Sequence, residues 1–365
     1  MSGPMGVSII VVNYNNERFL AAAIDSALGQ NHLPCETIVV DDFSTDHSRE
    51  IIASYGERVK AVLRESNGHQ IAALNGAWPL ARYPILIFLD SDDLLLCHAA
   101  ATVAQFWTTE TMKVQFPLLT IDGAGIQLGH MAPKYPPNLT TATIRTELLR
   151  TGGSPNSPAS GNAYSRSLLD RISLDGGFEF ENSREHWMDA VLECNAPFYG
   201  EVVTLHEPLG CYRIHDSNLY AFNTISAARF AAKAHTFELK VNYLAGRCRS
   251  WGIPFDRAAA LEGATWLHEC RLCAAKLSNG KAELVPFTLR GATKACIRAQ
   301  LPFVNRVLRI IWFIGVAPAP RFLAKQLIAL RFAPNQRPAW FENLLIKLSK
   351  INILPGPGRA RGINP

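Results

Sequence analysis

The sequence predicts an α/β protein built around a mostly parallel sheet, followed by a helical C-terminal region. Short apolar runs alternate with helical patterns through roughly the first hundred residues, an order typical of parallel strands joined by right-handed crossovers. Acidic residues directly follow two of these runs, at Asp41 and Asp90. After Asn218 the pattern changes to long helical stretches rich in Ala, Arg and Leu.

The elements of the sheet are expected in a regular order. Strands are predicted at residues 8–12, 37–40, 59–63 and 85–89, with helices at 17–28, 46–54 and 69–81 between them. Further on we expect an apolar run at 115–121, a polar loop at 151–160, a helix at 183–195 and a strand at 209–214. Because ligands of such sheets bind beyond the carboxyl ends of the strands, residues 13–15, 41–42 and 90–93 should share one rim.

Length and composition indicate one large catalytic domain with an appendage. The chain has 365 residues, of which 48% are hydrophobic and 18% charged, which is ample for a packed core and argues against disorder. The catalytic domain is predicted at 1–218, with a nucleotide-sugar half at about 1–100 and an acceptor half at about 101–218. A helical, basic region is predicted at 219–350 and a disordered tail at 351–365.

The charge is unevenly distributed along the chain. From Arg290 to the C-terminus there are 13 Lys and Arg and one acidic residue, Glu342, which gives that stretch +12. Since the whole chain carries +5, the remainder carries 5 − 12 = −7. Such asymmetry suggests a basic region that meets an anionic surface.

The cysteines favour a reduced compartment and a structural role. Eight are scattered through the chain, mostly inside apolar runs, and no secretory leader pattern precedes the first strand, so cytosolic thiols are expected. His268, Cys270 and Cys273 are spaced closely enough to suggest zinc, but they fall in EGATWLHECRLCAAKL, which is expected to be one amphipathic helix. A structural role for these three is the stronger interpretation.

The strongest chemical signal is the sequence Asp90-Ser91-Asp92-Asp93, which follows ILIFL. Three carboxylates within four residues repel one another unless a cation neutralises them. Carboxylate oxygens suit Mg²⁺ or Mn²⁺, which commonly complete their coordination with substrate phosphate oxygens. The alternative is an acidic cluster that complements the dipole of a following helix.

A second acidic signal, DDFSTD, follows the run ETIVV. A carboxylate of Asp41 or Asp42 at this rim can accept hydrogen bonds from a base or ribose. Ser44, Thr45 or Asp46 can equally cap the next helix, and both interpretations are compatible.

These motifs belong to a series of blocks that resembles family 2 glycosyltransferases of the GT-A fold, of a bacterial type that builds surface glycans. The blocks span about 7–218, or roughly 60% of the chain. In order they are VSIIVVNYNNERFLAAAIDSALGQ, ETIVVDDFSTD, NGHQIAALNGAW, ILIFLDSDD, SPASGNAYSRSLLDRI, MDAVLECNAPFYGEV and HEPLGCYRIHDSN. One block alone is weak evidence, but the ordered series is specific.

The resemblance implies donor-binding and metal-binding roles for residues on the predicted rim. It implies that Asp92 and Asp90 bind the metal, Mn²⁺ or Mg²⁺, and that His215 lies at the metal or the diphosphate. The alternative for His215 is a surface histidine at the end of a strand. Contacts to the nucleoside-diphosphate sugar are implied for the remaining residues: Tyr14, Asn15, Asp41, Asp42, Asn67, Gln70, Asn75, Ser91 and Asn162. Asp41 supports either the ribose or the fold.

Asp189 occupies the position where the family places its catalytic base. Inversion by single displacement requires one carboxylate to deprotonate the attacking hydroxyl. Glu185 and Glu193 lie one helical turn away on either side, so either is an alternative base. Met188 stands where the family more often has Glu or Ala.

Two other departures from the family pattern bear on specificity. Val12-Asn13-Tyr14 replaces the usual Pro-Thr-Tyr, which limits Val12 to backbone contacts with the donor. The Gln-x-x-Arg-Trp signature of processive synthases is missing and no apolar run is long enough to cross a membrane, which favours addition of a single sugar to a hydroxyl acceptor.

The C-terminal region suggests contact with an anionic membrane surface. Residues 303–316, 322–330 and 341–348 set Lys and Arg beside Trp, Phe and Leu, a combination typical of interfacial helices. We therefore expect a peripheral protein on the inner face of the cell membrane and a lipid-linked acceptor. A helical lid or a homodimer contact is the alternative, and nucleic acid is not expected because no recognised module accompanies the charge.

Two other functional classes compete with an active transferase. A nucleotidyltransferase predicts a Gly-rich, basic loop after the first strand, where this chain has NYNNERF. A catalytically silent, membrane-associated nucleotide-sugar binding module is disfavoured by the intact Asp90, Asp92, Asp189 and His215.

Overall fold

The computed structural model describes residues 5–178, 188–215, 225–278, 287–299, 301 and 303–333. The chain forms two compact units, the first made of Met1–Thr146 and Ser154–Ile214 and the second of Glu147–Gly153 and His215–Pro365. Several predictions lie outside the described residues: those for Glu185, Asn218, the helix at 341–348 and the tail at 351–365.

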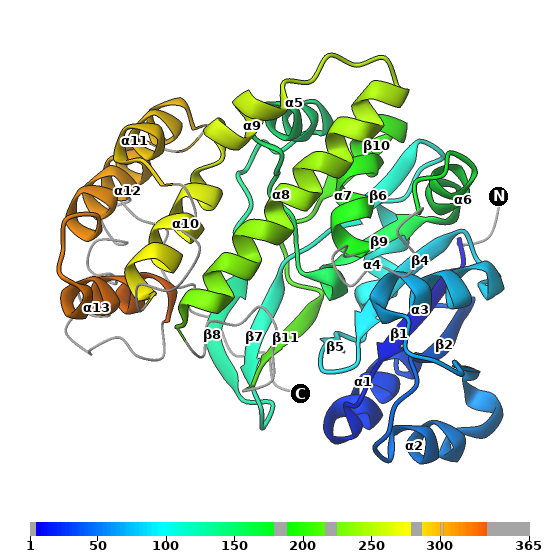
Figure 1. Cartoon of the computed structure of the whole chain (residues 1–365). Helices are drawn as coiled ribbons and strands as arrows, with labels where there is room; N and C mark the ends of the chain where they lie inside the picture. The colour runs from blue at the N-terminus through cyan, green and yellow to red at the C-terminus, as the bar shows by residue number, and fades with distance from the viewer. Residues whose placement is uncertain are drawn as a thin grey trace. The chain divides into compact units, whose positions relative to one another are not determined.

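A seven-stranded sheet forms the core of the first unit (Figure 1), and its parallel strands confirm the predicted fold class. Only β9 runs antiparallel to its neighbours. In sheet order the strands are β10 (Glu201–Thr204), β6 (Thr111–Gln115), β9 (Asn162–Ser165), β4 (Ile85–Asp90), β1 (Val7–Asn13), β2 (Cys35–Asp41) and β3 (Lys60–Leu63).

The central strands are apolar because helices cover both faces of the sheet. Val7, Ile9, Val11 and their neighbours on β1 are fully buried, as are most residues of β4, which is the pattern of a parallel strand covered on both sides. Asn13 pairs with Asp41, and Val12 pairs with Asp90. This register brings the polar ends of β1, β2 and β4 to one edge, as the sequence predicts.

Helices connect the strands close to the predicted positions. Asp46 precedes α2 and accepts hydrogen bonds from the backbone N–H of Ser48 and of Glu17 at 3.0 and 2.9 Å. The helix predicted at 69–81 ends at Ala77 and continues as a 3₁₀ turn over Trp78–Leu80, because Pro79 cannot donate an α-helical hydrogen bond. The helices of the first unit are α1 (Glu17–Leu28), α2 (Ser48–Ser54), α3 (His69–Ala77), α4 (Ala99–Gln105), α6 (Arg166–Leu174) and α7 (Met188–Tyr199). The helix α5 (Thr141–Thr151) begins in the first unit, and its last residues belong to the second.

A smaller sheet completes the first unit. The apolar run predicted at 115–121 covers the last residue of β6 and most of β7, with Phe116 and Pro117 between the two strands. Its four strands, in sheet order, are β5 (Leu94–Leu95), β11 (Gly210–Ile214), β7 (Leu118–Asp122) and β8 (Gln127–Ala132). The pairing of β5 with β11 sets the residues after Asp90 beside the Tyr-Arg-Ile-His segment.

The second unit is helical around its own apolar core, and its described helices are α8 (Ala227–Ser250), α9 (Arg257–Gly263), α10 (Thr265–Leu277), α11 (Leu289–Arg298), α12 (Phe303–Val316) and α13 (Arg321–Phe332). The single helix predicted over EGATWLHECRLCAAKL is wrong, because the chain breaks at Ala264 between α9 and α10. His268, Cys270 and Cys273 are buried on α10, in agreement with their structural interpretation.

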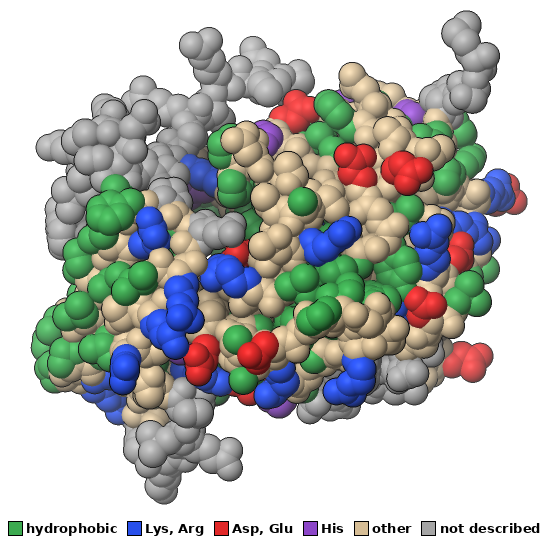
Figure 2. All heavy atoms as spheres, turned by 90° about the horizontal axis from the view of Figure 1, so that it is seen from above, with side chains coloured by type: hydrophobic (Ala, Val, Ile, Leu, Met, Phe, Trp, Pro, Cys, Tyr) green, Lys and Arg blue, Asp and Glu red, His purple; other side chains and the backbone are tan. Residues whose placement is uncertain are grey.

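The outer face of α12 is apolar, while its arginines are tied to the unit. Leu308, Ile311 and Ile314 are 40%, 58% and 52% exposed. Arg309 lies 3.4 Å from Glu269 of α10, and the guanidinium of Arg306 donates to the Ile297 carbonyl. Figure 2 shows hydrophobic and basic side chains side by side on the left of the view, the side on which Figure 1 draws α11 to α13. Among the described residues, none of the helices combines the length and apolarity that a membrane crossing requires.

Candidate active site

Three loops meet at the carboxyl edge of the main sheet, and each is unusual in its backbone. Asn15 after β1, Phe43 after β2 and His69 at the start of α3 have positive φ angles of 48°, 68° and 63°. Residues other than glycine rarely adopt this left-handed conformation, and it concentrates at ligand-binding segments. The backbone thus marks the same rim that the strand-end side chains indicate.

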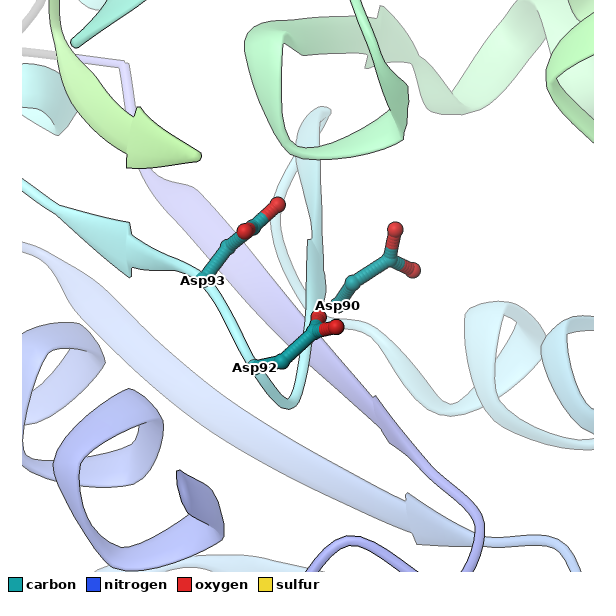
Figure 3. Close-up of side chains that lie close together, drawn as sticks. All are labelled: Asp90, Asp92 and Asp93. Atoms are coloured by element: carbon teal, nitrogen blue, oxygen red, sulfur yellow. The ribbon is translucent and has the colours of Figure 1, made fainter. Parts of the chain in front are cut away.

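The acidic turn joins β4 to β5, and Figure 3 shows its three carboxylates around one bend of the chain. Ligand oxygens of Asp90, Asp92 and Asp93 all lie within 4.8 Å of one another. They form the one group of at least three metal-ligating side chains found among the described residues. Ser91 is buried and anchors the turn, because its N–H donates to the Val12 carbonyl at 3.1 Å and its hydroxyl accepts from Asn16 at 3.1 Å.

Two side chains that the sequence did not single out hold this turn in shape. The Ser160 hydroxyl donates to Asp93 at 2.6 Å and accepts from the Asp90 N–H at 3.0 Å. Arg213 donates from its N–H to the Asp93 carboxylate at 2.9 Å and from Nε to the Asp92 carbonyl at 2.8 Å. Asp93 is therefore a buried anchor of the turn, and both supporting residues lie in the SPASGN and YRIH blocks.

The electrostatics of the turn favour a bound cation. Burial, followed by the charges of Asp92 and Asp189, raises the pKa of Asp90 to about 8. Burial, followed by the charges of Asp92 and Asp90, also raises the pKa of Asp93. A divalent cation offsets this mutual repulsion and favours the ionised carboxylates. The oxygen-only donor set fits Mg²⁺ or Mn²⁺.

The acidic residues that end β2 are paired within the protein. Asp41 is fully buried and accepts from Asn13, Ser44 and Arg49 at 2.9, 2.5 and 2.9 Å. Burial alone would raise its pKa, but these hydrogen bonds outweigh burial and lower the pKa. The geometry therefore gives Asp41 a role in the fold.

Asp42 shapes the segment that leads into α3. Its carboxylate lies 2.8 Å from Nε of Arg64 and accepts the Gly68 N–H at 3.0 Å, and its carbonyl accepts from the Asn67 side chain at 3.2 Å. Burial nevertheless leaves the pKa of Asp42 raised. Asn67 and Asp42 thus form one turn at the rim.

The other donor-side residues occupy different parts of this edge. The Tyr14 ring is 51% exposed. Asn15 is exposed and binds across to the β2 loop, since its side chain accepts the Thr45 N–H at 2.7 Å. Asn75 is half-buried on α3 and accepts from the Trp78 indole at 3.3 Å.

The predicted base lies at the start of α7, within electrostatic reach of the acidic turn. Asp189 accepts the Ala190 N–H at 2.8 Å, and its charge contributes to the raised pKa of Asp90. Glu193, the alternative base one turn later, is buried and accepts from both the N–H and the hydroxyl of Ser154 at 3.0 Å. Glu193 is thus committed to the loop, and the assignment of the base to Asp189 stays a prediction.

The polar loop before β9 is shaped by Asn162 from inside. The buried Asn162 amide donates to the carbonyls of Ser157 and Pro158 at 3.2 and 2.8 Å. A Cβ on Gly161 would lie 2.7 Å from the Phe116 carbonyl, so only glycine permits this close approach. Asn162 therefore helps to form the loop, and its predicted contact with the substrate stays a prediction.

His215 directly follows the last residue of β11 and belongs to the second unit. It is two residues beyond Arg213, whose N–H binds Asp93. Its place at the metal therefore stays a prediction.

Comparison with known proteins finds glycosyltransferases. The sequence model described as "Glycosyl transferase family 2" matches residues 8–173. An uncharacterized glycosyltransferase of Nostoc sp. is 32% identical over 234 residues, which cover 61% of this chain and 68% of that protein. The Escherichia coli UDP-Glc:alpha-D-GlcNAc-diphosphoundecaprenol beta-1,3-glucosyltransferase WfgD is 34% identical over 93 residues, covering 25% of this chain and 37% of that enzyme.

Among solved structures, S. aureus TarS 1–349 in complex with UDP-GlcNAc is similar to this chain with a TM-score of 0.50. The two are 16% identical, and the match covers 89% of this chain and 88% of TarS 1–349. At this identity the likeness concerns the fold, and it confirms the α/β architecture predicted from the ordered sequence blocks.

Proposed function

This chain belongs to glycosyltransferase family 2, and from that premise we propose that it transfers a single sugar from a nucleoside-diphosphate sugar to a hydroxyl acceptor, with inversion and with a divalent metal. The observation that carries the proposal is the meeting of two acidic elements, the turn after β4 and the start of α7. The charge of Asp189 acts on Asp90, so a base and a metal-binding turn lie within electrostatic reach of each other.

In this proposal Asp189 accepts the proton of the acceptor hydroxyl as its oxygen attacks the anomeric carbon. The new bond forms between that oxygen and the anomeric carbon, while the bond from the anomeric carbon to the diphosphate oxygen breaks. The electron pair leaves with the nucleoside diphosphate, and the proton stays on Asp189 until solvent removes it. Attack opposite the leaving group inverts the anomeric centre.

Asp90 and Asp92 would hold Mn²⁺ or Mg²⁺, with His215 as a further ligand. When bound, the ion supplies positive charge to the diphosphate as negative charge develops there. Support comes from the clustered oxygens of the turn and from the raised pKa of Asp90, both of which favour a cation. The buried Asp93 keeps the turn in shape through Ser160 and Arg213.

The nucleoside is proposed to lie along the β1 and β2 loops. The exposed Tyr14 ring offers a stacking face for the base. Asn15 and Asn67 hold the two loops that border this face, through Thr45 and Asp42 respectively. Ser91 and Asn75 would line the donor side.

We also propose that the enzyme works at the inner face of the cell membrane on a lipid-linked acceptor. Residues 287–333 contain eight Lys and Arg and no acidic residue, and the outer face of α12 exposes Leu308, Ile311 and Ile314. Apolar insertion combined with basic charge is typical of interfacial helices. The relative from E. coli is named for a lipid-diphosphate acceptor, which supports the same class for this chain. A homodimer that covers α12 is the competing explanation of this surface.

Release of nucleoside diphosphate from a panel of nucleotide sugars tests the function directly. We expect wild-type protein with Mn²⁺ to hydrolyse or transfer from one donor, and EDTA to abolish the release. The Asp189→Asn variant should bind that donor normally and lose turnover by about 10²–10⁴-fold, the usual contribution of a general base. A wild-type protein that binds a donor but never turns it over, with lipid-linked acceptors supplied, would instead establish the silent binding module. Transfer of a nucleotide from an added nucleoside triphosphate to a sugar phosphate, with release of pyrophosphate, would establish the nucleotidyltransferase.

A further inference from the structure

We infer that Gln70 is a positioning residue that ties the base-bearing helix α7 to the acidic turn after β4, rather than a contact to the sugar donor. The inference rests on the proposed function, in which Asp90 holds the metal and Asp189 is the base. It assigns Gln70 a role that differs from the donor contact implied by family resemblance.

The side chain of Gln70 is engaged by protein groups at both ends. Its Oε1 accepts the Met188 N–H at 3.3 Å, and its side chain lies close enough to the Asp90 carboxylate to lower the pKa of Asp90 against the effect of burial. A primary amide carries its acceptor oxygen and its donor nitrogen on opposite sides of one plane. A carboxylate accepts hydrogen bonds, so the amide nitrogen of Gln70 faces Asp90 while its oxygen faces α7.

The hydrogen bond to Met188 ties Gln70 to the helix that carries the base. Met188 is the first described residue of α7, and Asp189 follows it. Gln70 of α3 thus accepts a hydrogen bond from the residue directly before the base. Met188 itself is buried, which further fixes the point from which the Asp189 side chain projects.

Gln70 can serve as a link because its own backbone is held firmly. The preceding Gly68 donates to the Asp42 carboxylate at 3.0 Å, and Arg64 joins Asp42 to the carbonyl of Ala72 in the same helix, at 2.8 and 2.7 Å. His69 adopts a left-handed conformation immediately before Gln70. The turn proposed to border the nucleoside therefore also fixes the link to the base.

The consequence is that the Gln70 amide contacts both the acidic turn proposed to bind the metal and the helix that carries the proposed base. A cation that holds the Asp90 carboxylate also fixes the partner of Gln70, and Gln70 fixes the first turn of α7. Loss of the amide should therefore misplace Asp189 while the donor still binds. Displacement of a reacting group by about 1 Å can cost about 10²-fold in rate.

Steady-state kinetics of Gln70→Leu separates this role from a donor contact. We expect kcat to fall about 10–100-fold, whereas KM for the donor should change by less than about threefold because no uniform binding contact is lost. The variant Gln70→Glu keeps an oxygen for the Met188 N–H but loses the donor to Asp90, so its kcat should fall as well. A normal kcat in Gln70→Leu, or a loss confined to KM, would overturn the inference.

The matched control is Gln30→Leu. The Gln30 amide also bridges separate segments, since it donates to the carbonyls of Ser26 and Leu96 at 2.9 and 3.0 Å and accepts the Ala100 N–H at 2.9 Å. Its loss should lower stability as a bridging amide does, and it should leave kcat and KM unchanged. An equal fall of kcat in both variants would show that Gln70→Leu acts through general destabilisation, and it would contradict the inference.

Hydrogen–deuterium exchange tests the link without any turnover. In Gln70→Leu, peptides covering Met188 and Asp189 should exchange faster than in the wild type, and in Gln30→Leu they should not. Unchanged exchange there would contradict the link even if the enzyme were active. A wild-type protein that lacks transferase activity while Gln70→Leu still accelerates this exchange would count against the proposed function but leave the link between α3 and α7 standing.

Discussion

Two acidic motifs end the strands on either side of β1, yet the first carboxylate of each motif has its pKa shifted in the opposite direction. Asp41 at the end of β2 has its pKa lowered, because hydrogen bonds from Ser44, Asn13 and Arg49 outweigh its burial. Asp90 at the end of β4 has its pKa raised to about 8 by burial and by the charges of Asp92 and Asp189. Both strands pair with β1, so position in the sheet does not explain the difference.

The difference shows that the charge of a strand-end carboxylate can be neutralised by the protein's own side chains or left to be neutralised by a ligand. At β2 the protein supplies the cations itself, with Arg49 on Asp41 and Arg64 on Asp42. At β4 three carboxylates lie in one turn. Ser160 and Arg213 support this turn, but within it they hydrogen-bond the Asp93 carboxylate and backbone groups. The first motif stabilises the fold, and we propose that the second recruits a divalent ion and the diphosphate.

The largest expected effect separates the two motifs by activity. Asp92→Asn should lower turnover by about 10²–10³-fold, the usual cost of one electrostatic contact to the reacting group. Its free energy of unfolding should stay the same or rise, because a like charge next to Asp90 and Asp93 is removed. Donor turnover and chemical denaturation measure the two quantities. The exposed Asp170 of α6 provides the control, Asp170→Asn, for which neither should change.

A smaller effect, on stability instead of turnover, is expected at β2. Asp41→Asn should lower the free energy of unfolding by about 2 kcal/mol, because it weakens hydrogen bonds to a buried carboxylate and its ion pair with the partly exposed Arg49. Urea denaturation of both proteins measures this difference. A stable Asp41→Asn variant that cannot bind donor would show that Asp41 contacts the ribose after all.

The same pair of proteins should also differ in their dependence on pH. A carboxylate with a lowered folded pKa contributes stability above its unfolded pKa and loses it as pH falls through the folded pKa. The advantage of the wild type over Asp41→Asn should therefore be full at neutral pH and shrink below about pH 4. A constant difference across this range would exclude ionised Asp41 as its source.

The smallest effect is expected at Asp42, which stands between the two roles. Asp42→Asn weakens the contact to Arg64 and loosens the turn through Asn67 and Gly68. We expect donor affinity to fall about tenfold, or roughly 1.4 kcal/mol, with little change in kcat. Calorimetric titration with the donor measures this affinity. An unchanged affinity would show that this turn does not contribute to binding of the nucleoside.

Local sequence patterns were sufficient to predict the acidic rim. Apolar runs followed directly by Asp41 and Asp90 fix both the strands and the edge at which those carboxylates lie, because the carboxyl ends of parallel strands coincide. The helix α12 was likewise predicted at its observed bounds, Phe303–Val316.

The supports of the site depend on contacts between distant segments, which no local pattern reveals. Ser160 binds Asp93 across 67 residues and Arg213 across 120, and Gln70 reaches Met188 across 118. The break between α9 and α10 follows directly after Gly263, where an added Cβ would lie 3.0 Å from the distant Arg150 carbonyl oxygen. In each case the residue is visible in the sequence, but its partner can be identified only from the folded structure.

The central claim is that the turn after β4 binds a divalent ion together with a nucleoside diphosphate. Titration with Mn²⁺, followed by electron paramagnetic resonance of the free ion, measures this directly with UDP, GDP or dTDP present in separate experiments. The account predicts one tight Mn²⁺ site that needs a nucleoside diphosphate and that is weakened at least about tenfold in Asp92→Asn, while Asp41→Asn that remains folded retains it. Equal Mn²⁺ affinity in the wild type and in Asp92→Asn would contradict it.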